Sequence, residues 1–162
     1  MADIPTLLEK ANKLFEVADH LTYVTYPMVK EPKLIFTITE HILNSCVSAM
    51  DALLYYEYTY KRIDSYQNNN FMEKINIFKY KVAPRYGIDR KHIFIMEDLK
   101  MILDRHKKSP VEFSKNNSII MCNPNYEVTT ITIEKVKNYV YESKNFLNKV
   151  NSLLKTQNAR RH

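Results

Sequence analysis

The stretch LIFTITEHILNSCVSAMDALLYYEYTY, residues 34–60, decides the fold. Its apolar side chains recur at steps of three and four positions, which is the spacing of one face of an α-helix. Pro32 precedes the stretch and no glycine or proline interrupts it, so we predict one long helix over residues 32–63. A row of small side chains on this helix should let a second helix pack closely against it: Ser45, Ala49 and Ala52.

The same spacing recurs in other parts of the chain. It predicts further helices over residues 4–26, 70–83, 89–108 and 132–155. Pro27 is expected to end or kink the first of them and Pro84 to stop the helix over 70–83, because proline lacks a backbone N–H. Short polar side chains suited to N-caps precede four of the five helices: Asp3, Asn70, Asp89 and Thr132.

Between the last two predicted helices the pattern changes. β-Branched and apolar residues at 118–122 and 126–131 flank the turn residues Asn123, Pro124 and Asn125, which predicts a small β-hairpin. We therefore predict a mainly all-α fold, a four- to five-helix bundle with this hairpin before the last helix. Residues 1–155 form one domain in this prediction, and residues 156–162 form a basic polar tail.

The composition limits the classes of function. Gly87 is the only glycine, so the chain lacks the glycine-rich loops of Walker-type and dinucleotide-binding sites. The two cysteines, Cys46 and Cys122, are too few for a disulfide framework or a zinc knuckle. No apolar run approaches the roughly 18–20 residues needed to cross a bilayer, and the N-terminus lacks the pattern of a signal peptide. We expect a cytoplasmic protein with no bound metal, cofactor or membrane.

Charge is distributed unevenly along the chain. Residues 1–80 carry a net charge of −2, and residues 81–162 carry +8. Tyr80 and Tyr86 lie among the basic residues of the second half, and such rings can stack on unpaired bases while cations meet phosphates. The predicted nucleic-acid-binding residues are Lys79, Lys81, Arg85, Arg90, Lys91, Arg105, Lys107 and Lys108.

Arg85 and His92 are the two candidate catalytic residues. In a metal-independent ribonuclease, an arginine can hold the scissile phosphate while a histidine moves the proton of the attacking 2′-hydroxyl. The other interpretation is that both residues belong to an ordinary basic turn, with His92 solvated in the first turn of its helix. Asp89 and His92 have no partners at metal-ligand spacing, so we predict no metal site.

Four tyrosines crowd the end of the long helix. They cannot all point inward, since Tyr56 and Tyr60 share one helical face while Tyr55 and Tyr58 share another. Exposed tyrosines suit a protein interface. The alternative is that these four side chains form the hydroxyl-tipped edge of the core.

The chain resembles the HEPN domains (higher-eukaryote and prokaryote nucleotide-binding), through its helical bundle with a long second helix and through Arg85-x6-His92. It is also similar to small uncharacterised archaeal proteins of this length, in ADHLTYVTYPMVK (18–30), MDALLYYEYTYKRI (50–63) and HKKSPVEF (106–113). The HEPN resemblance implies a metal-independent RNase or an inactive relative, dimeric and tied to toxin–antitoxin or defence systems. In that case Arg85 would bind phosphate and His92 would be the general acid/base. Tyr86 departs from the family, where a polar residue commonly follows the arginine.

Three functions follow from these observations. Our first prediction is a non-enzymatic protein that binds RNA or a ribonucleoprotein through a basic face and associates with itself, as a homodimer, or with a protein partner. The second is the HEPN-type RNase or its inactive relative. The third is a protein-interaction adaptor that uses the tyrosine-rich helix end.

Overall fold

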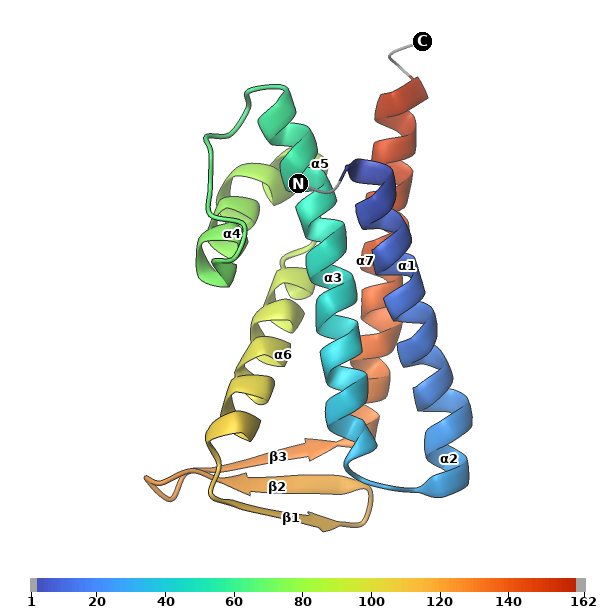
Figure 1. The fold of residues 1–162 in the computed structure, drawn as a ribbon, viewed down its shortest axis with the longest axis vertical. Helices are drawn as coiled ribbons and strands as arrows, with labels where there is room; N and C mark the ends of the chain where they lie inside the picture. Colours follow the sequence, from blue (N-terminus) through green and yellow to red (C-terminus); the bar gives the residue numbers. More distant parts are fainter. Residues whose placement is uncertain (1–2, 160–162) are drawn as a thin grey trace.

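Helix α3 (Leu34–Thr59) lies at the centre of the fold in the computed structural model, which describes residues 3–159 (Figure 1). Helices α1 (Ile4–His20) and α7 (Ile133–Ala159) pack along one side of it, and α6 (Arg90–Lys108) packs along the other. The predicted helical bundle is confirmed.

The small side chains of α3 bring α1 close to it, as predicted. The hydroxyl of Ser45 donates to the backbone oxygen of Ala11 at 2.6 Å, and that of Ser48 donates to the oxygen of Leu7 at 2.8 Å. A helix backbone can come within reach of a short hydroxyl only where no larger side chain separates the two helices. These bonds also satisfy two hydroxyl groups that are buried between the helices.

The prediction that Pro84 stops its helix is wrong, and Pro27 does not end its helix either, because each helix continues past its proline for most of a turn. A five-residue π-helical turn precedes each proline: η1 (Leu21–Thr25) before α2 (Tyr26–Val29), and η2 (Phe78–Val82) between α4 (Phe71–Ile77) and α5 (Ala83–Tyr86). A proline ring clashes with the carbonyl four positions earlier. The wider π turn, with its bonds to the fifth residue back, moves that carbonyl aside.

Both proline turns end at a residue in the left-handed conformation. Lys30 closes α2 with φ 50°, and Gly87 closes α5 with φ 65°. The Gly87 N–H donates to the oxygen of Ala83. This is the conformation that glycine adopts without strain, so the only glycine of the chain ends a helix.

The predicted hairpin is present, but a third strand extends it. Strands β1 (Val111–Lys115), β2 (Ser118–Cys122) and β3 (Val128–Thr132) form an antiparallel sheet in the order β1-β2-β3. Asn116 and Asn117 join the first two strands, with φ 47° and 62°. Positive φ at both central residues is the geometry of a type I′ hairpin turn, and asparagine tolerates it better than most residues do.

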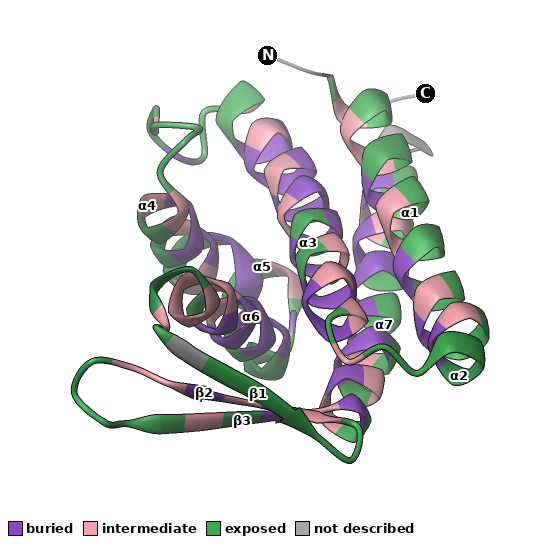
Figure 2. Cartoon of the chain, turned by 60° about the horizontal axis from the view of Figure 1, so that its bottom comes forward, coloured by how far each residue is buried: buried purple, intermediate pink, exposed green. Residues whose placement is uncertain are grey.

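The sheet closes one end of the bundle (Figure 2). Ile119, Met121 and Ile131 are buried, whereas Phe113 and Val128 are exposed. The side chains of a strand alternate between its faces, so the buried set defines the face that packs on the helices. The outer face stays in contact with solvent.

The helix boundaries follow the predicted caps. Asp3, Asn70 and Asp89 each accept a hydrogen bond from a backbone N–H of the helix that follows, and Thr132 does the same for α7. Helix α7 continues to Ala159, beyond the predicted end at residue 155. Residues 160–162 of the predicted tail lie outside the described residues. Within residues 3–159, no helix is long and apolar enough to cross a membrane.

Candidate nucleic-acid interface

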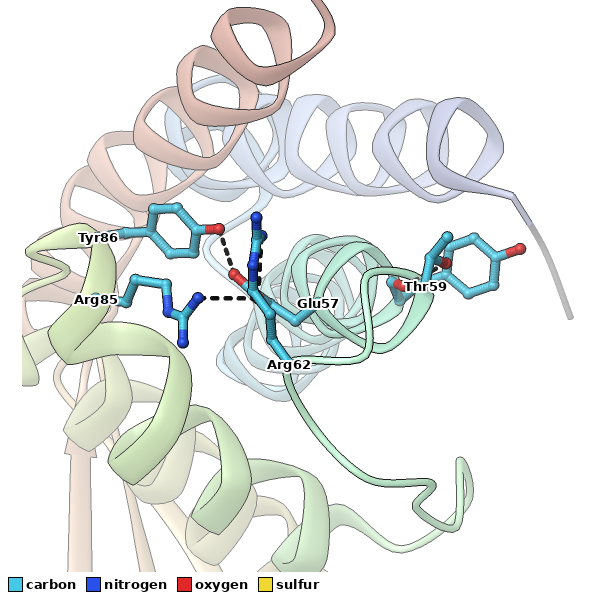
Figure 3. Close-up of polar contacts among 6 residues, drawn as sticks. Glu57, Thr59, Arg62, Arg85 and Tyr86 are labelled. Carbon is cyan, nitrogen blue, oxygen red and sulfur yellow. Dashed lines mark hydrogen bonds and ion pairs between the residues drawn. The ribbon is translucent and has the colours of Figure 1, made fainter. Parts of the chain in front are cut away.

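A buried carboxylate lies where the end of α3 meets α5. Glu57 is 1% exposed, and its Oε1 atom accepts a hydrogen bond from the hydroxyl of Tyr86 (Figure 3). Its Oε2 atom lies 3.4 Å from Nη1 of Arg62 and 3.9 Å from Nη1 of Arg85. One carboxylate thus faces two guanidinium groups, so this cluster carries a net positive charge.

The proline turn of α5 positions two members of the cluster. Arg85 and Tyr86 follow Pro84 directly and lie within the last turn before Gly87. A Cβ atom at Gly87 would meet nothing within 4 Å. The requirement for glycine here is therefore conformational rather than steric, and the left-handed residue sets where the chain leaves α5.

Burial and the neighbouring carboxylate both act on Tyr86. Desolvation, followed by its hydrogen bond to Glu57, raises the pKa of the Tyr86 hydroxyl to about 12. The hydroxyl therefore keeps its proton at neutral pH and remains a donor. Arg62 is held from a second side, since its guanidinium carbon lies 5.7 Å and 5.3 Å from the ring centres of Tyr56 and Tyr60.

The eight predicted cations are exposed or half-buried, as expected. They do not form one continuous face, however. Five lie between Lys79 and Lys91, and three lie between Arg105 and Lys108 at the opposite end of α6. At a rise of about 1.5 Å per residue, roughly 25 Å of helix separates the two groups.

Several of these cations are already engaged within the chain. Lys79 lies 3.8 Å from Glu97, and Lys91 lies 3.3 Å from Glu142. Arg105 donates to the hydroxyl of Thr129 and so ties α6 to the sheet. Near Glu57, Lys81 and Arg90 have no ion pair in the described part of the chain, and the same holds for Lys107 and Lys108 at the far end. We call the cations nearest to Glu57 the junction patch: Arg62, Lys81, Arg85, Arg90 and Lys91.

Two exposed aromatic rings accompany the junction patch. Tyr80 is 65% exposed and Phe94 is 63% exposed. The ammonium of Lys79 lies 5.5 Å from the Tyr80 ring centre. Phe94 follows Arg90 by four positions on α6, so both lie on one helical face. Single exposed apolar side chains are common on protein surfaces, so these two rings indicate recognition only through their position beside the cations.

The interpretation that places His92 in solvent is wrong. Its side chain is buried, its ring centre lies 5.5 Å from that of Phe146, and its Nδ1 atom has no hydrogen-bond partner among the described residues. Helix α7 covers the first turn of α6 at this point, which the sequence of α6 does not reveal. Burial lowers the pKa of the His92 imidazole. Arg85 instead contacts Glu57.

The four tyrosines at the end of α3 divide between core and surface. Tyr56 is 5% exposed, so the expectation that it contributes to a surface interface is wrong, because its ring packs beside Tyr60 and under Arg62. Tyr55 and Tyr60 are half-buried, and Tyr58 is 42% exposed.

Sequence reasoning missed three residues of this site. Glu57 and Arg62 become partners only when the chain turns at the end of α3, and the exposed ring of Phe94 was not considered. One signal was present: an acidic residue at a buried position of an apolar helix calls for a cation nearby. Groups of three or more His, Cys, Asp or Glu side chains placed to hold a metal do not occur among residues 3–159.

None of the comparisons with known proteins, whether with family models, curated proteins or solved structures, finds a match.

Proposed function

We propose that this protein binds single-stranded RNA without cleaving it, through the junction patch and the rings of Tyr80 and Phe94. The observation that carries the proposal is the pairing of exposed aromatic rings with surplus cations at one helix junction. Stacking on aromatic rings and contact of cations with phosphates together make up sequence-tolerant recognition of single strands.

Binding without cleavage is favoured by the environment of His92. A general base needs a ring nitrogen that reaches the proton it removes. The Nδ1 atom of His92 is buried against α7, and the structure records no contact between His92 and Arg85 among the described residues. The HEPN-type RNase thus has less support than a binding function. Self-association and the adaptor role of the tyrosine-rich helix end stay predictions.

Fluorescence anisotropy of a labelled single-stranded RNA tests the proposal. If three or four phosphates are engaged, the affinity should fall at least about tenfold between about 50 and 200 mM salt. Phe94→Ala should weaken binding by about 5- to 100-fold, the loss of one stacked base. Arg90→Glu should weaken it too, because it reverses a charge in the patch.

Lys108→Glu is the matched control, since it makes the same charge change at the far end of α6. Equal losses in Arg90→Glu and Lys108→Glu would mean that only overall charge matters, and would contradict the proposed site. A salt-independent affinity would exclude phosphate contacts. Cleavage of the RNA in EDTA that His92→Ala abolishes would establish the RNase instead.

A further inference from the structure

A groove of about 590 Å³ lies where the first half of α3, the end of α6 and strand β1 meet. It is remote from the junction patch, at the opposite end of α6. Phe36, Leu43 and Leu103 give the groove apolar walls. This volume is in the range of pockets that hold small organic molecules.

One histidine is held rigidly in this groove. The ring of His106 stacks on that of Phe36, with the ring centres 3.7 Å apart and the planes 18° apart. Its Nδ1 atom lies 2.7 Å from Oε1 of Glu112. Because a carboxylate accepts, Nδ1 carries the hydrogen, and Nε2 is left as the other polar atom of the ring. The structure records no partner for Nε2 among the residues it describes.

The charge of the groove is positive. Lys33 and Lys107 line it without an ion pair in the described part of the chain, whereas Lys100 is paired with Asp104 at 3.3 Å. Glu112 hydrogen-bonds to His106 and keeps its negative charge beside the neutral ring, and Glu40 is the other acid of the lining. The lining thus holds three lysines against two glutamates, and two of the lysines are unpaired among the described residues, which favours an anionic ligand.

We infer that this groove binds an organic phosphate monoester with a flat apolar part. Lys33 and Lys107 would meet the phosphate oxygens as charge-assisted donors. Nε2 of His106 would accept the hydroxyl hydrogen of a monoanionic phosphate. Leu43 and Leu103 would contact the apolar part. The ligand is either a free small molecule or the terminal phosphate of an RNA.

Calorimetric titration with phenyl phosphate tests this inference, with phenol and inorganic phosphate as the two partial ligands. Phenyl phosphate should bind at least about tenfold more tightly than either part alone, since the groove offers both an apolar wall and cations. His106→Ala and Lys107→Glu should each lower that affinity by about tenfold or more. Lys108→Glu, one residue away but outside this lining, should leave it unchanged.

A second pair of titrations identifies the source of the phosphate. Two RNAs are compared, one with a terminal phosphate and the same RNA without it. If Lys107→Glu weakens binding of only the phosphorylated RNA, the ligand is the RNA end. If the variant weakens binding of phenyl phosphate and leaves the affinity for both RNAs unchanged, the ligand is a free molecule. Arg90→Glu should leave phenyl phosphate binding intact, so failure of the RNA proposal would not remove this one. Absence of phenyl phosphate binding at millimolar concentration would overturn it, as would equal losses in Lys107→Glu and Lys108→Glu.

Discussion

Removing the acid of the Glu57 cluster should cost less stability than removing its two arginines. Glu57 is almost completely buried, whereas the side chains of Arg62 and Arg85 are 35% and 47% exposed. In Glu57→Gln the two arginines can turn to water. In Arg62→Gln/Arg85→Gln the carboxylate stays in the interior without either of its two ion pairs, and the hydrogen bond from Tyr86 remains. A buried carboxylate without a compensating cation lowers the free energy of unfolding more than two arginines that can turn to water.

The magnitudes follow from the distances. At 3.4 and 3.9 Å, each ion pair contributes about 1 kcal/mol in a water-like dielectric. The Tyr86 hydrogen bond loses about 1 kcal/mol more when its acceptor becomes neutral. A neutral amide is cheaper to bury than a carboxylate, which offsets part of this sum, so we expect Glu57→Gln to cost about 1–2 kcal/mol. The double arginine variant should cost about 3–5 kcal/mol.

Urea denaturation followed by circular dichroism measures both variants, and RNA anisotropy adds a second readout. Glu57→Gln should bind RNA more tightly than the wild type, by about twofold to fivefold, because it removes a negative charge beside the junction patch. The double variant should bind more weakly. The reasoning is refuted if Glu57→Gln is as destabilising as the double variant, or if it weakens RNA binding.

Three further outcomes are expected from the same structure. Gly87→Ala should lower the free energy of unfolding by about 1–2 kcal/mol, the cost of a left-handed residue with a Cβ, and Gly87→Asn should lower it less; equal effects in denaturant melts would contradict the conformational argument. Burial lowers the pKa of His92, so the unfolded chain takes up its proton first and the wild type should lose stability as the pH falls below about 6.5. The His92→Leu variant should not lose stability in this pH range. If the free energies of unfolding of the two proteins changed in parallel with pH, His92 would not be the cause of the loss. Burial raises the pKa of the Cys46 thiol to about 12, so a thiol reagent should modify Cys122 quickly and Cys46 only on unfolding; fast reaction of both would place Cys46 at the surface.

The sequence by itself determined the local features of this protein. Helical spacing, the caps at Asp3, Asn70, Asp89 and Thr132, and the close packing allowed by Ser45 were all readable, because each depends on residues a few positions apart. The same is true of the β2–β3 hairpin. The general exposure of the basic residues was readable because lysine and arginine are seldom buried.

Two local features differ from the prediction: the backbone at the two prolines and the presence of strand β1. Pro27 was expected to end or kink its helix and Pro84 to stop its own, since the clash of the ring with the preceding turn usually does so. The π turns relieve that clash, and nothing in the spacing of side chains reports them. Strand β1 was missed because Asn116 and Asn117 define a turn only once strands on both sides pair.

Only the tertiary structure decided where the candidate sites lie. Glu57 meets Arg85 and Tyr86 across nearly thirty residues of chain, and His106 meets Phe36 across seventy. His92 is buried by a helix that begins some forty residues later. Charge and burial at these points are properties of surfaces brought together by folding, so a side chain's own neighbours along the chain say little about which partner it will have.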